Sequence, residues 1–158
     1  MPSATNRSKR TNRTKRLAIS AMFAALALIF SYVEAIIPFS VGIPGVKLGI
    51  ANLVVIIALY EMNFRYAFTI NIIRILVAGL LFNGLFGAVY SLSGGILSLV
   101  IMWILKKTGW FSMIGVSMAG GVAHNIGQLL IAAAVVSNLR MFLYFPILMF
   151  SGIVSGIA

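Results

Sequence analysis

Residues 17–37 read LAISAMFAALALIFSYVEAII, and this stretch decides the class of the fold. It is 21 residues long, and Glu34 is its one charged residue. A helix needs about 20 mostly apolar residues to cross the hydrocarbon core of a bilayer, because each residue adds only about 1.5 Å. The stretch therefore predicts a transmembrane helix.

A basic segment precedes this stretch. It holds six of the chain's 12 Lys and Arg residues within the first 16 positions: Arg7, Lys9, Arg10, Arg13, Lys15 and Arg16. Such a segment is typical of a topology signal that stays in the cytoplasm against anionic lipid. Nucleic-acid binding fits less well, since the basic segment directly abuts an apolar stretch. A cleaved signal peptide also fits less well, since the apolar run reaches Pro38 without a convincing cleavage site. We divide the chain into a basic cytoplasmic tail at 1–16 and a transmembrane domain at 17–158.

The remainder of the sequence repeats the apolar pattern. Hydrophobic residues make up 61% of the chain and charged residues 9%, against about 25% charged residues in a soluble domain. Polar, Gly and Pro breaks divide it into six apolar segments, at 17–37, 47–62, 64–82, 85–105, 112–136 and 140–158. The sequence predicts an all-α integral membrane protein of six transmembrane helices.

The distribution of basic residues predicts the orientation. With the N-terminus inside, the cytoplasmic ends hold the six basic residues of the tail together with Arg65, Lys106 and Lys107, whereas the outer ends hold only Lys47 and Arg140. Lys and Arg are enriched on the cytoplasmic side of membrane proteins. We expect both termini in the cytoplasm of a bacterial cell, with the chain in the cytoplasmic membrane.

Several kinds of chemistry are excluded by composition. The chain has no Asp, no Cys, two Glu and one His. Carboxylate clusters for Mg²⁺ on a diphosphate, thiol catalysis and Cys-ligated zinc are therefore out of reach. No glycine cluster is followed by the Lys-Ser/Thr of a phosphate loop. We expect no catalytic activity, no metal and no cofactor.

A few polar side chains fall inside the predicted spans, where an ionisable group costs at least about 2.5 kcal/mol. They are Glu34, Lys47, Arg74 and His124, with amides at Asn52, Asn71, Asn125 and Gln128. The predicted orientation places them in the middle and outer part of the bilayer. Helical spacing puts Asn71 with Arg74, and His124 with Gln128, on shared faces. The set indicates either an outward-open pocket for an anionic group or a buried Glu34–Arg74 ion pair with amides linking helices.

Two further features stay open between two interpretations. The segment 38–46 holds two Pro and two Gly, so it is either a lid over the pocket or a plain connection. Ala21 and Ala25, like Gly152 and Gly156, are small residues four positions apart. Such pairs let helices approach closely, either inside the bundle or against a partner.

Three stretches carry a resemblance to a known family: PGVKLGIAN at 44–52, SLSGGILS at 91–98 and GVAHNIGQ at 121–128. They resemble the small bacterial membrane family labelled Gx transporter, also described as heptaprenyl diphosphate synthase component I. This family in turn resembles the substrate-binding S components of energy-coupling factor vitamin transporters. That likeness implies an S-component-like bundle with both ends inside, an outward-facing site, and a first helix whose Ala21 and Ala25 contact a T subunit coupled to two ATPases.

The resemblance also implies the residues of the site. The matched positions are Lys47, Asn52, His124, Asn125 and Gln128, to which Arg74 is added on physical grounds. The leading expectation is a substrate-binding subunit of an uptake transporter for a small molecule, powered by separate ATPase and T subunits. The alternative is a non-catalytic membrane component of heptaprenyl diphosphate metabolism, a precursor pathway for quinones. A structural membrane subunit without ligand is a third reading.

Overall fold

The computed structural model describes residues 4–36, 50–136, 143 and 145–157. In this part of the chain the regular structure is entirely helical. The elements are α1 (Ala4–Ile36), α2 (Ile50–Glu61), α3 (Phe64–Ala78), the π-helical turn η1 (Gly79–Asn83), α4 (Gly84–Thr108), α5 (Met113–Val136) and α6 (Phe145–Ile157). Each predicted span overlaps one of the six α-helices, so the all-α, six-helix prediction is confirmed.

The helices differ in whether they are long enough to span a membrane. Four apolar stretches of sufficient length occur in the described residues: Thr11–Ile36, Phe64–Phe82, Gly84–Thr108 and Met113–Val135. Helices α2 and α6 have 12 and 13 residues. At about 1.5 Å per residue they cover roughly 18–20 Å of a hydrocarbon core about 30 Å thick. Each follows a stretch of the chain that lies outside the described residues.

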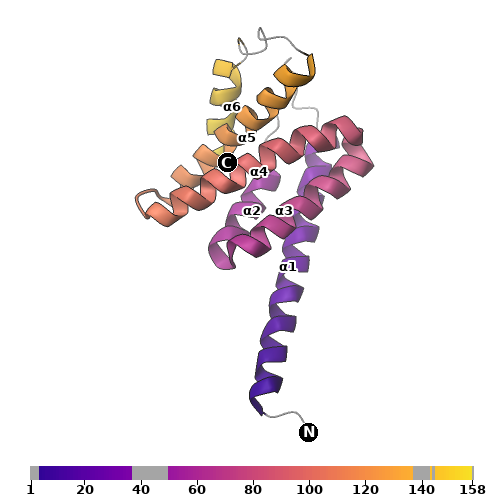
Figure 1. Ribbon diagram of the computed structural model, residues 1–158, viewed down its shortest axis with the longest axis vertical. Coiled ribbons are helices and arrows are strands. Elements are labelled where there is room, and N and C mark those ends of the chain that lie inside the picture. The colour runs from indigo at the N-terminus through magenta and orange to yellow at the C-terminus, as the bar shows by residue number, and fades with distance from the viewer. Residues whose placement is uncertain (1–3, 37–49, 137–142, 144, 158) are drawn as a thin grey trace.

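Helix α1 includes most of the residues expected as a basic tail. It runs unbroken for 33 residues, because no Pro or Gly occurs between Ala4 and Ile36. Its length is about 50 Å, well beyond the thickness of the hydrocarbon core. The N-terminal part therefore projects from the bundle (Figure 1). The tail and the first span are one continuous helix in the structure.

The predicted breaks that follow residues 62, 82 and 105 coincide with turns in the described residues. Met62 and Asn63 separate α2 from α3, and the α3–α4 hairpin turns at Gly84, which has a φ of 68°. The turn after α4 contains Gly109, with a φ of 70°. Side chains with a Cβ rarely adopt such positive φ values, so glycine is required at both turns.

Helix α4 is packed between α3 and α5, and α5 packs in turn against α6 (Figure 1). Helix α1 packs against α2, α3 and η1, so it lies at the edge of the bundle. The short helix α2 supplies the largest share of the core, including Val54, Val55, Ile56 and Leu59. Gly152 and Gly156 contact the backbone of α5 at Gly121 and Met118, so this small-residue pair packs inside the bundle.

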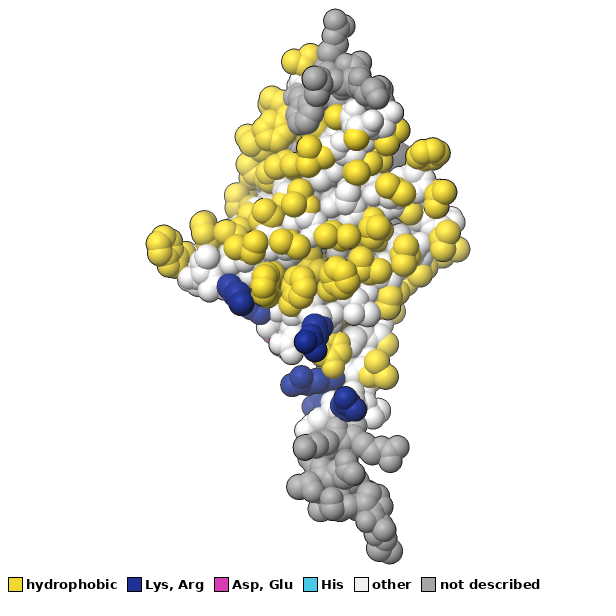
Figure 2. Space-filling model, viewed as in Figure 1, with side chains coloured by type: hydrophobic (Ala, Val, Ile, Leu, Met, Phe, Trp, Pro, Cys, Tyr) yellow, Lys and Arg dark blue, Asp and Glu magenta, His cyan; other side chains and the backbone are white. Residues whose placement is uncertain are grey.

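Apolar and basic side chains occupy different parts of the surface along the molecule. Figure 2 shows hydrophobic side chains covering the body of the bundle, and Lys and Arg side chains gathered where this apolar surface ends. Helices that face lipid are expected to expose apolar side chains, because the surrounding lipid tails are themselves apolar. The protein is therefore a membrane protein that has a basic end and an opposite end.

Candidate functional site

The most deeply placed charge of the bundle is that of Arg74 on α3. Its side chain is 8% exposed, and its Nη2 donates a hydrogen bond of 2.8 Å to Asn71 Oδ1. Asn71 Nδ2 donates in turn to the carbonyl oxygen of Gly95 on α4, at 2.9 Å. Arg74 lies nine residues beyond Arg65, or about 14 Å along the helix, close to half the thickness of the hydrocarbon core. The guanidinium is thus held in place near the middle of the apolar stretch Phe64–Phe82.

Gly94 and Gly95 join this side of the site to helix α5. Gly95 lies against Asn71, while Gly94 lies against His124 and Gln128. A Cβ at Gly94 would sit 2.6 Å from the carbonyl oxygen of His124, so the two helices cross at the closest distance that glycine allows. These two residues are adjacent on α4. They therefore bring the polar side chains of α3 and α5 to opposite sides of the same short segment of α4.

His124 and Gln128 form the α5 side of this arrangement. A Cβ at Gly94 would lie 3.0 Å from Gln128 Cγ and 3.1 Å from His124 Cε1. Close by, Ser93 Oγ donates to the Gly127 carbonyl oxygen at 2.9 Å, which ties α4 to α5. The predicted i,i+4 pair thus shares a face, and that face is directed at α4.

Asn52 on α2 lies about as far from the α2–α3 turn as Arg74 does on α3. The two residues are ten and eleven positions from the tight turn at Met62 and Asn63, so each is about 15–17 Å from it along its helix. Helices α2 and α3 pack against each other, and Asn52 is 9% exposed. We call the residues at this depth, Asn52, Asn71, Arg74, His124 and Gln128, the polar layer.

Glu34 contributes the acidic charge beside this layer. It is half-buried on α1, which packs against α3, and its carboxylate acts electrostatically on the Arg74 guanidinium. Opposite charges attract strongly where water is scarce. The described part of the site therefore contains one cation, Arg74, and one acid, Glu34, of opposite charge.

The remaining predicted residues divide by their surroundings. Asn125 donates from Nδ2 to the Leu148 carbonyl oxygen on α6, at 2.7 Å, so it links two helices rather than joining the polar layer. Lys47 and the segment 38–46 lie outside the described residues. Ala21 and Ala25 are exposed on α1. Asn71 and the Gly94–Gly95 pair belong to the site although neither was among the predicted binding residues. Their signals in the sequence are an amide one turn before Arg74 and two adjacent glycines within a span.

Two polar atoms of the layer can each form a further hydrogen bond. Within the described residues, Arg74 Nε and Asn52 Oδ1 are buried without a hydrogen-bond partner. A buried polar group left unsatisfied is costly, so such atoms are candidates for contact with a ligand. No group of three or more metal-binding side chains occurs in the described parts of the chain. The arrangement is suited to binding a polar or anionic group.

Fold and site together define a helical membrane protein with a polar layer at mid-depth. The family model described as heptaprenyl diphosphate synthase component I matches residues 23–158. The chain belongs to this family, which confirms the first part of the resemblance seen in the sequence. No curated protein and no solved structure gives a significant match.

Proposed function

We propose that this protein is a non-catalytic membrane component of heptaprenyl diphosphate metabolism that binds the charged head of a prenyl diphosphate in the polar layer. The family description favours this alternative over the uptake function that led the sequence analysis. The observation that carries the proposal is Arg74, a cation fixed by Asn71 near the middle of the bilayer with Nε still available. A prenyl chain is apolar enough to remain among the lipid-facing helices while its head reaches this depth.

The proposal assigns the chemical step to another subunit. Prenyl chain elongation uses clustered carboxylates to hold Mg²⁺ on the diphosphate, whereas the two Glu of this chain are 27 positions apart and Asp is lacking. A component I implies at least one further component, and we assign catalysis to that partner. In this arrangement the membrane subunit would keep the lipid-soluble substrate or product next to its partner.

A diphosphate brings several negative charges into a site where Glu34 already balances Arg74. We therefore expect the ligand to take the place of the Glu34 carboxylate at Arg74, with Lys47 as the second cation. Charge-assisted hydrogen bonds to an Arg guanidinium are strong and can be bidentate, which favours this exchange. His124 and Gln128 would donate to the remaining oxygens, and Asn52 would do so through Nδ2, because its Oδ1 can only accept.

Native mass spectrometry of the gently purified protein tests this function. We expect a prenyl diphosphate to bind more tightly than the matching prenyl alcohol, and Arg74→Gln to weaken diphosphate binding by about tenfold or more, since hydrogen bonds to a charged group are lost. Arg65→Gln is the matched control, because Arg65 is exposed at the basic end of the same helix. Equal binding of the diphosphate and the alcohol by the wild-type protein would count against the proposal.

A second candidate function has one observation in its favour. Ala21 and Ala25 are exposed on α1 at the edge of the bundle, where a T subunit would need to contact an S-component-like protein. The polar layer would then bind a water-soluble substrate for uptake, and translocation would depend on the T subunit and two ATPases. A water-soluble metabolite that co-purifies with the protein, in place of a prenyl compound, would select this function.

A further inference from the structure

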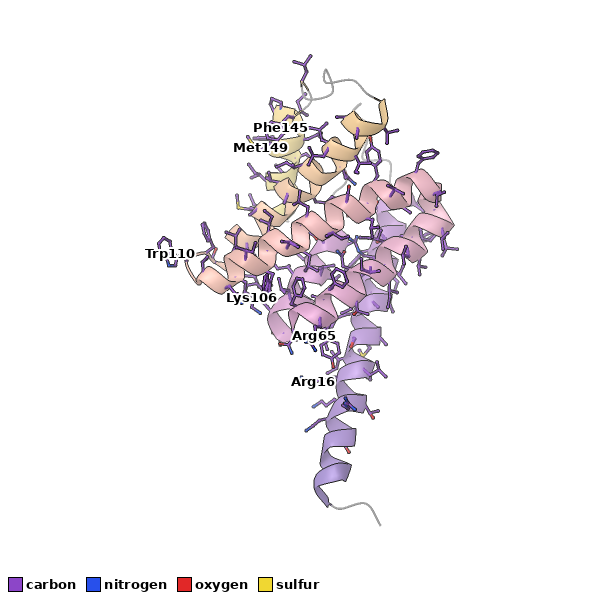
Figure 3. The ribbon with its side chains drawn as sticks, viewed as in Figure 1. Arg16, Arg65, Lys106, Trp110, Phe145 and Met149 are labelled. Atoms are coloured by element: carbon purple, nitrogen blue, oxygen red, sulfur yellow. The ribbon has the colours of Figure 1, made fainter. Side chains whose placement is uncertain are left out.

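The basic end of the bundle carries a charge that the chain itself leaves uncompensated. The described side chains there are Arg13, Lys15 and Arg16 on α1, Arg65 on α3, and Lys106 and Lys107 on α4. Figure 3 shows Arg16, Arg65 and Lys106 at the same end, on the side from which α1 projects. Glu61 is the one acid near them, since Glu34 lies eighteen residues beyond Arg16, or about 27 Å along α1. We call these six basic residues the basic rim.

Aromatic side chains lie directly against the rim. Lys107 Nζ is 4.5 Å from the centroid of the Trp103 ring, and Trp103 contacts Phe64 with ring centroids 5.1 Å apart. The contact brings the beginning of α3 and the end of α4 together. The second Trp of the chain, Trp110, is 90% exposed in the turn that follows α4. Trp residues concentrate at membrane–water interfaces, so this end of the bundle is at headgroup level.

A role in stabilising a helix end explains only some of the basic residues in the rim. Lys106 Nζ donates to the Leu59 carbonyl oxygen at 2.6 Å and lies 4.7 Å from the Tyr60 ring centroid, so Lys106 caps the end of α2. Arg65 has the opposite relation to its helix. It lies in the first turn of α3, where the helix dipole disfavours a positive charge. Both Arg65 and Lys107 are exposed.

We propose that the basic rim binds the headgroups of anionic phospholipids, with Arg65 and Lys107 as the principal contacts. The apolar surface of the bundle ends at this level (Figure 2), so lipid acyl chains along α3 and α4 would place their phosphates beside these two residues. Long basic side chains extend readily from the edge of an apolar surface to a headgroup. Clustered Lys and Arg next to a membrane span attract anionic lipid. This surface is separate from the polar layer, and the inference stands whether or not the layer binds a prenyl diphosphate.

The two Trp residues make the proposal measurable, because both lie at the basic end. The full chain is reconstituted into bilayers that contain either brominated phosphatidylglycerol or brominated phosphatidylcholine at the same mole fraction. Bromine quenches Trp fluorescence at short range, so the ratio of the two quenching curves reports the local enrichment of the anionic lipid. We expect about fivefold enrichment at low salt, which corresponds to one well-formed basic contact. Added salt should reduce it.

Paired variants assign the effect to individual side chains. The double change Arg65→Gln with Lys107→Gln should bring the enrichment close to one, while Glu61→Gln, the matched control at the same end, should preserve or increase it. Circular dichroism of each variant establishes that the helices are retained. Equal quenching by both lipids around the wild-type protein overturns the proposal and leaves an acidic protein partner as the candidate occupant. Enrichment that persists in a folded double variant overturns the assignment to Arg65 and Lys107.

Discussion

At the scale of single residues, Arg74 determines how the polar layer is understood. It is held by Asn71 and influenced by Glu34, so the proposed ligand site and an internal charge pair would share this residue. Both alternatives from the sequence analysis therefore meet at one side chain. The two roles differ in what happens when the charges are removed singly or together.

Arg74→Leu should lower the melting temperature markedly, because it leaves Glu34 without its cation. Removing one partner of a buried pair typically costs about 3–5 kcal/mol. Adding Glu34→Leu should restore much of that stability, since no uncompensated charge remains. Trp fluorescence during thermal unfolding measures both variants. The folded double variant should no longer bind the ligand, and retained binding would show that Arg74 has no part in the site.

Gly94 is the residue at which the geometry of the layer is most sensitive to size. A Cβ there would lie 2.6 Å from the His124 carbonyl oxygen, a backbone atom that cannot move away cheaply. Gly94→Ala should therefore force α4 and α5 apart and lower stability by about 1–3 kcal/mol, as overpacking commonly does. Gly115→Ala on α5 is the matched control, because its Cβ would make only ordinary contacts, the nearest at 3.6 Å. A Gly94→Ala protein as stable as this control would contradict the crossing described here.

At the scale of helices, α1 has one face that the bundle covers and one that it leaves open. It buries Ala27 completely, while Ala21 and Ala25 are exposed. Small residues on the outer face of a helix allow another helix to approach closely. Internal packing does not account for this pair, in contrast to Gly152 and Gly156. The exposed pair is therefore where a partner helix is best sought.

Ala21→Trp should leave the isolated protein folded and able to bind its ligand, because the side chain points away from the bundle. If a T subunit contacts this face, the same change should abolish co-purification with tagged T and ATPase subunits, as the bulky ring holds the partner helix away. Ala27→Trp is the matched control on the same helix and should destabilise the protein itself. An Ala21→Trp protein that retains both its melting temperature and its partner removes this face from the interface.

At the scale of the whole molecule, the orientation of the bundle in the membrane determines from which side a ligand reaches the polar layer. The basic rim and the projecting end of α1 lie at one end, and basic residues favour the cytoplasmic side. With that end inside, the end of α1 at Ile36 lies on the outer side.

Introduced cysteines can test this orientation without background, because the chain has no Cys. In intact cells, a membrane-impermeant thiol reagent should label Ser40→Cys and should not label Thr108→Cys. Permeabilised cells serve as the control and should show labelling at both positions. The reverse pattern in intact cells would place the basic end outside and would exclude entry of ligand from the outer face.

The sequence by itself determined the class of the protein, the number of helices and the positions of its turns. These properties depend on local quantities, namely the length of each apolar run and the Gly, Pro and polar residues between runs. Helical spacing also placed Asn71 with Arg74 and His124 with Gln128 on shared faces, and the structure agrees. The family was indicated by three short stretches and is confirmed over most of the chain.

Only the tertiary structure decided which neighbour each polar face meets. Spacing fixes a side chain's depth and its direction on its own helix, but the adjoining helix is set by hairpin register and by glycine crossings. Asn125 therefore links α5 to α6 instead of joining the polar layer, and Gly95 receives the amide of Asn71. The small-residue pairs show the same limit. Gly152 and Gly156 are buried against α5, whereas Ala21 and Ala25 are exposed. Both pairs have the same spacing, so the spacing alone could not predict what lies opposite each pair.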